Sequence, residues 1–164
     1  MTDDEVHSAL VRWLADTLSV RVIRDHEGGA RPQLPYVMAN FLGSVEVRDH
    51  AQRIEYSSAR PDPADVVATP VLEIEWRFSV HAYGPTPTDI LRPLRSASRL
   101  SQVIEPMLPR LNIFEMSQIR NVPDWVNERW EPRAQLDIML RGLTRDGFII
   151  DTIDDMDVNI DRRG

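Results

Sequence analysis

The stretch from 72 to 83 constrains the fold more than any other part of the sequence, because its side chains alternate between apolar and polar throughout. Successive side chains of a strand point to opposite faces of a sheet, so the alternation predicts one long strand with a buried face and a face in water. The residues expected to point inward are Leu72, Ile74, Trp76, Phe78, Val80 and Ala82. The residues expected in water are Glu73, Glu75, Arg77, Ser79, His81 and Tyr83. The chain therefore has to build a sheet around this segment.

Shorter runs of alternating or β-branched residues predict the other strands of the sheet. They stand at 20–25, 34–42, 44–56, 111–121, 133–140 and 148–160. Residues 57–70 between them are predicted to form a long loop, because three prolines and several small residues fit neither a helix nor a strand. Two interpretations of this loop stay open, a solvated insertion and an arm that becomes ordered against a neighbouring subunit.

Two amphipathic helices accompany these strands. The first begins at Thr2, where Thr2 and Glu5 have the spacing of a capping box, and the second begins after Thr86, with Pro87 at its first position. The second helix is expected to continue to Met107. The first buried stripe is predicted to be Val6, Leu10, Trp13, Leu14 and Leu18, and the second Ile90, Leu91, Leu94, Ala97 and Leu100.

Together these elements predict an α+β fold, a single mixed, mostly antiparallel β-sheet with two main helices packed on it. A chain of 164 residues is long enough to bury a core without disulfides or metals, so residues 1–164 are expected to form one domain. No apolar run approaches the ~20 residues that span a bilayer, and the acidic start of the sequence is interpreted as a mature cytoplasmic N-terminus.

The sequence contains neither Cys nor Lys, and all 19 basic residues are Arg. Disulfides and thiolate metal sites are excluded, and so are Walker A loops, Schiff-base and pyridoxal chemistry and lysine-dependent nuclease motifs. The sequence also has no glycine-rich dinucleotide loop and no nucleophile elbow. We therefore expect no catalytic residue and no cofactor.

The net charge is −7, from 26 acidic and 19 basic residues. This balance disfavours a surface that grips nucleic acid by neutralising phosphates, although it is compatible with DNA that passes the protein without binding.

The acidic segment at the end of the sequence is the strongest candidate for a metal site. Its oxygen-bearing residues are Asp151, Asp154, Asp155, Asp157, Asn159 and Asp161. The spacing from Asp155 echoes a calcium loop, but Ile160 occupies the position where such a loop requires Gly. Met156, Val158 and Ile160 alternate with the acids, so the favoured interpretation is a half-buried strand with a solvated acidic face. The four histidines lack the spacing of a zinc site.

Arg92, Arg95 and Arg99 form a row along one side of the second helix, at the spacing i, i+3, i+7. The row is either a wet helix face or a surface that pairs with an acidic neighbour. Asp155 and Asp157 on the last strand are the candidate partners, and such a pairing of two different surfaces can close identical subunits into a ring.

Three short stretches, in this order and spacing, resemble the tail terminator, or neck terminator, proteins of tailed phages. They are RPQLPYV at 31–37, FSVHAYG at 78–84 and EPRAQLD at 131–137. The likeness extends from about residue 5 to 160 and includes the first helix. The family has no catalytic motif to carry over to this chain.

The resemblance implies a structural virion protein that forms a homo-oligomeric ring, expected to be a hexamer. Such a ring would cap the tail tube, stop its polymerisation and join the tail to the head or neck. The implied partners are further copies of the chain, the tail tube protein, head completion or connector proteins and, in a contractile tail, the sheath. Genomic DNA would pass through the lumen without specific binding, and no membrane is involved. The protein would assemble in the host cytoplasm and reside at the head–tail junction.

Two alternatives accompany this hypothesis. The first is a related head–tail connector or stopper, or a tube component of a contractile injection system. The second is a divalent-metal-dependent enzyme that uses the acidic C-terminal segment.

Overall fold

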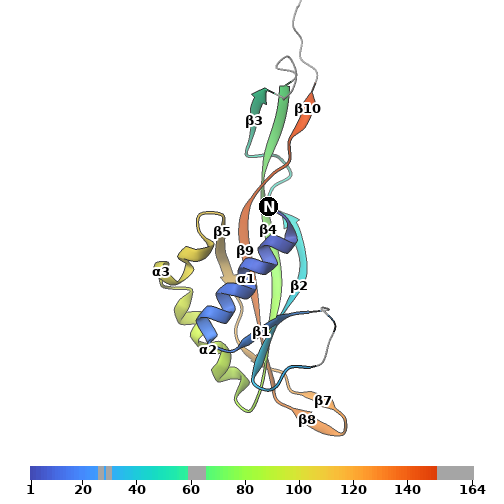
Figure 1. The fold of residues 1–164 in the computed structure, drawn as a ribbon, viewed down its shortest axis with the longest axis vertical. Coiled ribbons are helices and arrows are strands. Elements are labelled where there is room, and N and C mark those ends of the chain that lie inside the picture. The colour runs from blue at the N-terminus through green and yellow to red at the C-terminus, as the bar shows by residue number, and fades with distance from the viewer. Residues whose placement is uncertain (26–27, 29–30, 59–65, 151–164) are drawn as a thin grey trace, which may run out of the picture.

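The computed structural model describes residues 1–25, 28, 31–58 and 66–150. It confirms the α+β fold, with a mixed, mostly antiparallel sheet and the helices gathered on one face of it (Figure 1). One part of the sheet extends beyond the helices along the long axis of the molecule. We call the helix-covered part the body and the extension the arm.

Strand β4 (Val66–Tyr83) is the centre of the sheet and runs through both parts. In the body, the strand order is β1 (Arg21–Arg24), β2 (Tyr36–Glu46), β4, β9 (Arg133–Arg145) and β5 (Leu111–Met116), and β1 and β2 are parallel. In the arm, β3 (Arg53–Ser58) and β10 (Phe148–Ile150) both pair with β4. The short strand β6 (Arg120–Asn121) pairs with β9.

Helix α1 (Asp3–Leu18) begins as predicted. The Thr2 hydroxyl accepts a hydrogen bond from the Glu5 backbone, and the Thr2 backbone donates to the Glu5 carboxylate at 2.8 Å, which completes the capping box. The helix packs across the sheet (Figure 1). The indole of Trp76 on β4 donates to Asp3 at 2.7 Å, so the first turn of the helix is tied to the central strand.

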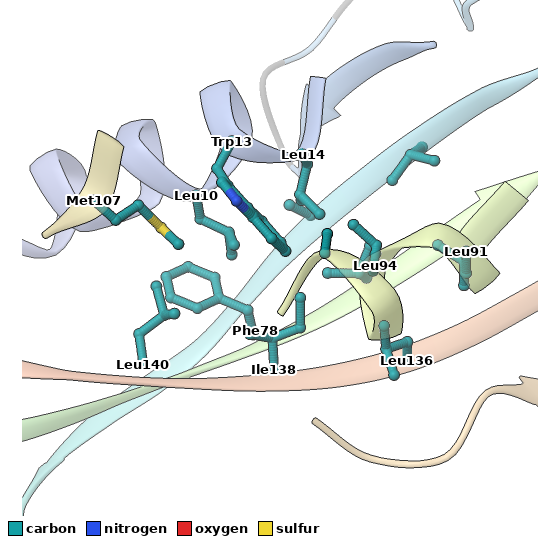
Figure 2. Close-up of a cluster of buried hydrophobic side chains, with 14 of the residues drawn as sticks. Leu10, Trp13, Leu14, Phe78, Leu91, Leu94, Met107, Leu136, Ile138 and Leu140 are labelled. Atoms are coloured by element: carbon teal, nitrogen blue, oxygen red, sulfur yellow. The ribbon is translucent and has the colours of Figure 1, made fainter. Parts of the chain in front are cut away.

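The core lies between the helices and the body sheet (Figure 2). Leu10, Trp13 and Leu14 of α1 meet Phe78 of β4, and Leu91 and Leu94 of α2 (Pro87–Ala97) pack beside them. Strand β9 contributes every second residue to this layer, namely Ala134, Leu136, Ile138 and Leu140. The alternation in the sequence therefore correctly predicted the inner face of the body sheet.

The second helix is shorter than predicted. Helix α2 ends at Ala97, and a separate turn of helix, α3 (Ser101–Ile104), leads into the 3-10 turn η1 (Glu105–Met107). Leu100 lies at the break and is exposed, so its prediction as a core residue was wrong.

The predicted strand 44–56 and the predicted loop 57–70 were wrong at their boundaries. Strand β2 continues through Glu46, and β3 extends to Ser58. Strand β4 begins at Val66, and residues 66–70 pair with β3 on one side. On the other side residues 66–68 pair with β10, and β9 pairs only from Val71 on, so Thr69 and Pro70 have no partner strand there. A proline is tolerated in a strand at such a break. Residues 59–65 lie outside the described part of the chain.

The second face of β4 was predicted to be wet, yet Glu75, Ser79 and His81 are buried. No helix of the described residues covers this face in Figure 1. The cover comes from side chains on the neighbouring strands, because β4 is flanked by β2 and β9 along its whole length in the body. A central strand loses exposure on both faces in this way, and the local pattern of one strand does not reveal it.

The strand predicted at 111–121 divides into β5 and β6. Of the strand predicted at 148–160, the described residues include only 148–150, and these form β10. The region between β6 and β9 forms a separate hairpin of β7 (Asp124–Val126) and β8 (Arg129–Glu131).

Candidate interaction surfaces

The arm carries an apolar face that no helix of the described residues covers. Sheet register places Tyr56, Ala68 and Phe148 in one row across the three strands. Ile54 with Pro70, and Val66 with Ile150, form the rows on either side. Tyr56 is 64% exposed and Phe148 is 61% exposed. We call this surface the arm face, made of Ile54, Tyr56, Val66, Ala68, Pro70, Phe148 and Ile150.

The arm face continues the buried face of the body. Side chains two residues apart on a strand point the same way, so Ala68 and Pro70 of β4 share a side with Trp76 and Phe78. Trp76 and Phe78 lie under the helices with at most 1% exposure. Contiguous exposed apolar surface on a protein marks an interaction site. The arm face is therefore a core face that lacks its cover within the described chain.

A second apolar surface lies at the opposite end of the molecule, on the β7–β8 hairpin (Figure 1). Trp125 and Trp130 face each other across the hairpin, with ring centroids 5.1 Å apart in an edge-on arrangement, and both are more than half exposed. Asn127 and Glu128 at its tip have positive φ angles of 48° and 60°. Two successive positive φ values define the type I′ turn that matches the twist of a hairpin.

An arginine holds this hairpin against the sheet. Arg31 forms an ion pair with Glu131 of β8 and donates to the hydroxyl of Tyr36. Its guanidinium also lies 5.6 Å from the ring centroids of both Tyr36 and Tyr83, which stack on each other at 4.8 Å. Cation–π contact and a paired carboxylate together fix the hairpin's position.

The three arginines of the predicted row differ in their contacts. Arg92 forms an ion pair with Asp89 of its own helix at 2.7 Å, and Arg95 donates to the Ser117 carbonyl at 2.5 Å. Arg95 and Arg99 line a groove between α2 and β5, together with Ser98 and residues 113–116, whereas Arg92 does not line it. Asp155 and Asp157, the predicted partners of the row, lie outside the described residues.

The sheet face opposite the helices carries a buried polar network. Ser79 donates to Asp137 at 2.7 Å, and Gln135 donates to both of them. Nearby, Nδ1 of the buried His81 has no hydrogen-bond partner among the described residues. Burial lowers the pKa of His81, and the charge of Arg133 lowers it further, so the imidazole stays neutral near pH 7.

Glu75 is the buried acid of the same face. Burial by itself would raise its pKa, but hydrogen bonds from Arg141 and Arg77 outweigh that effect and hold the pKa below its ordinary value. Arg141 also lies over the ring of Phe114 on β5, 3.3 Å from its centroid. Glu75 therefore serves an ion-pair network and not a solvated strand face.

The described residues bring no three His, Asp or Glu side chains together at a spacing that could hold a metal ion. His7 instead bonds the Ala39 carbonyl through Nε2 at 3.0 Å, between α1 and β2. The acidic segment 151–161 is outside the part of the chain covered by this statement. None of the described helices has the length and apolarity to cross a membrane.

Sequence reasoning missed both apolar surfaces. The signal for the hairpin was Asn127–Glu128 between two tryptophans, since Asn favours a positive φ. The signal for the arm was the uninterrupted apolar run of 148–150 beside Val66 and Val67, which a strand with one wet face would not contain.

Comparison with solved structures defines the class of the fold. The sheath/tube terminator of an extracellular contractile injection system, PVC, in its extended state has the same fold, with a TM-score of 0.54 at 12% sequence identity. The match covers 100% of this chain and 65% of that one, so this chain spans less than two thirds of the neighbour's length. A second solved structure matches 87% of this chain and 96% of its own at 14% identity, but its TM-score of 0.37 is too low to indicate a shared fold. The chain thus has an α+β terminator-like fold.

The sequence itself gives the family. The model of the phage neck terminator proteins matches residues 4–163, and this chain belongs to that family. It is accordingly a structural protein of the phage neck. No curated protein sequence matches the chain.

Proposed function

We propose that this protein caps the tail tube as a homo-oligomeric ring, expected to be a hexamer, stops tube polymerisation and joins the tail to the head or neck. The ring would sit at the head–tail junction of the virion after assembly in the host cytoplasm. Its partners would be further copies of itself, the tail tube protein, head completion or connector proteins and, in a contractile tail, the sheath. Residues 1–164 would act as one domain, without a catalytic residue or cofactor.

The arm face is the observation that carries this proposal. It continues the core face of β4 beyond the helices, and Tyr56 and Phe148 remain mostly exposed on it. A ring of identical subunits supplies a cover for such a surface, because each arm packs on the body of the next subunit. Family membership and the terminator-like fold support the same function.

The exposed hairpin provides a second surface for a different partner. It lies at the other end of the long axis from the arm (Figure 1). A terminator has to bind its own copies sideways and other proteins above and below, so it needs separate surfaces. Exposed tryptophans such as Trp125 and Trp130 are typical anchors of protein interfaces. We assign the arm to the ring contact and the hairpin to the tube or neck partner.

The charge of the chain suits a pore through which DNA passes. A net charge of −7 repels phosphates, so the genome would slide through the lumen without being held.

The test is negative-stain microscopy combined with a solution mass measurement, for the protein alone and mixed with tail tubes. We expect closed rings, at the latest when tubes are present, seated at tube ends and blocking further growth of the tubes. A strict monomer at high concentration and in the presence of tubes would overturn the proposal.

Variants of the two surfaces separate their roles. Phe148→Ser on the arm should reduce ring formation, whereas Trp130→Ser on the hairpin should leave rings intact and weaken their attachment to tubes or neck proteins. Leu42→Ser is the matched control, because Leu42 is equally exposed, at 62%, but belongs to neither surface. Equal effects of all three substitutions would contradict this division.

A further inference from the structure

Strand β5 has an open outer edge. Among the described residues its one strand partner is β9, which lies on its inner side. An edge strand presents unpaired backbone N–H and C=O groups, and these form a template for another strand. The pairing of β5 with β9 shifts register between Ile113 and Glu115, so Phe114 bulges there and is 50% exposed.

The groove beside this edge is positively charged on its helix side. Arg95 of α2 and Arg99, which follows the end of the helix, both line it. Glu115 is the single acidic residue among those lining the groove. On the other side of the edge, Phe114 offers an apolar ring that is backed by Arg141. A strand added here would have to be acidic on one face and apolar on the other.

The sequence after β10 has this pattern. Asp155, Asp157 and Asp161 alternate with Met156, Val158 and Ile160. In an extended segment these two sets point to opposite faces. The acids would then face Arg95 and Arg99 while the apolar residues lie over Phe114.

The reach of the chain decides which copy can supply this strand. The chain leaves β10 at Ile150, which pairs with Val66 at the arm end of β4. The groove lies beside Ile113, at the level of Leu140 and therefore of Trp76. Strand β4 rises about 33 Å from Val66 to Trp76.

The Cα atoms of Asp155 and Asp157 follow Ile150 too closely in the sequence to cover that distance. A fully extended chain would carry these two Cα atoms at most about 18 and 25 Å from that of Ile150. The chain at Ile150 is also heading away from the body, because β10 continues in the direction of β9. Both the reach of the backbone and its direction at Ile150 therefore favour Arg95 and Arg99 of a second copy over those of the same subunit.

We infer that residues 155–161 of one copy add as a strand to the β5 edge of a second copy, with Asp155 and Asp157 against Arg95 and Arg99. This contact rests on the proposed ring and specifies how neighbouring subunits are linked. Of the three arginines in the predicted row, the contact uses only Arg95 and Arg99, since Arg92 lies outside the groove and pairs with Asp89.

Disulfide trapping tests the contact directly, because the chain contains no cysteine of its own. The full-length double variant Phe114→Cys with Val158→Cys, oxidised under ring-forming conditions, should yield covalent dimers and higher oligomers on a non-reducing gel. The matched control is Leu42→Cys with Val158→Cys, which should remain monomeric. Rings without cross-linked oligomers, or a cross-link confined to the monomer, would overturn the inference.

Charge exchange provides a second measurement. Arg95→Glu with Arg99→Glu in one chain, or Asp155→Arg with Asp157→Arg in another, should raise the concentration needed for ring formation about tenfold or more, because attraction becomes repulsion. Mixing the two variants should restore assembly. Arg92→Glu is the control on the same helix and should have little effect.

The outcomes separate the two proposals. If the unmodified protein forms rings but the charge variants form them equally well, the strand contact is wrong and the ring function stands. If the unmodified protein forms no ring with tubes, both are wrong.

Discussion

The body and the arm share strand β4, yet its inner face is buried in the body and largely uncovered in the arm. Between Trp76 and Ala82 the even-numbered side chains lie under α1 and α2 and are almost fully buried. Toward Val66 the same face has flanking strands, β3 and β10, but no helix within the described residues (Figure 1). Both stretches of this face carry apolar side chains, so the difference shows that cover by a second layer, and not apolar character alone, determines what is buried.

The comparison has a consequence for folding and assembly. A sheet face covered by helices stabilises the monomer, because apolar area is removed from water. An uncovered face contributes that stabilisation only when a partner binds. Substitutions in the body should therefore appear as lost monomer stability, and substitutions in the arm as lost assembly.

The largest expected contrast is between two phenylalanines. Phe78→Ala in the body should lower the free energy of unfolding by about 3–5 kcal/mol, because it leaves a cavity beneath α1. Phe148→Ala in the arm should cost the monomer less than about 1 kcal/mol. Urea unfolding of both variants at a concentration where the protein is monomeric measures this difference. Equal losses would show that the arm has a core of its own.

Two glycines sharpen the contrast in the backbone. A Cβ at Gly142 in the body would lie 2.5 Å from the Arg110 carbonyl oxygen, so Gly142→Ala should cost about 2–3 kcal/mol. At Gly147, beside the arm, the nearest atom would be a methyl of Val67 at 2.8 Å, and a side chain can move aside. Gly147→Ala should therefore cost less than half as much. Thermal unfolding midpoints of the two variants provide the measurement, and a larger loss for Gly147→Ala would reverse the expected order.

Glu75 and Glu55 allow a buried ion-pair network to be compared with an exposed one. Glu75→Gln in the body leaves Arg141 and Arg77 without their carboxylate, and we expect a loss of about 1–2 kcal/mol. Glu55 in the arm pairs with Arg53 and Arg145 in water, and Glu55→Gln should be close to neutral.

Both of these glutamates have a lowered pKa in the folded protein. For Glu75 the Arg141 and Arg77 hydrogen bonds overcome the opposing effect of burial, and for Glu55 the hydrogen bond from Arg53 is the largest cause. Their stabilisation is therefore present above pH 4.5 and is lost as the pH falls below it. The unfolding free energy, measured from pH 7 to pH 3, should therefore decrease less steeply with falling pH in Glu75→Gln than in the unmodified protein.

The smallest effect is expected at His81. Because burial and Arg133 lower its pKa below 6.5, the unfolded chain binds the proton more readily than the folded one. Stability should then decrease as the pH falls through 6.5, well above the range in which the glutamates act. The charged neighbours that shape this titration are Arg133, Asp137, Asp124 and Arg120. His81→Gln should remove the slope between pH 7 and 5.5, and an unchanged slope would assign it to another group.

Local sequence predicted those elements whose signals lie within a few residues. The capping box of Thr2 and Glu5, the stripe of α1 and the inner faces of β4 and β9 all follow from hydrogen-bonding chemistry or side-chain periodicity. The same reasoning misplaced 57–70, since three prolines outweighed the β-branched Val66 and Val67 in a local interpretation. Pairing with β3 and β10 on both sides supplies the hydrogen bonds that make this end of β4 a strand.

The sequence by itself determined the periodicity of the strands, the start of α1 and the absence of lysine and cysteine chemistry, because each of these is a property of neighbouring residues or of composition. Only the tertiary structure decided which faces are covered. Ser79 and His81 became buried beneath side chains of adjacent strands, while Tyr56 and Phe148 stayed exposed where the helices end. Burial depends on segments far apart in the chain, so the surfaces that we assign to assembly emerge only once the sheet has formed.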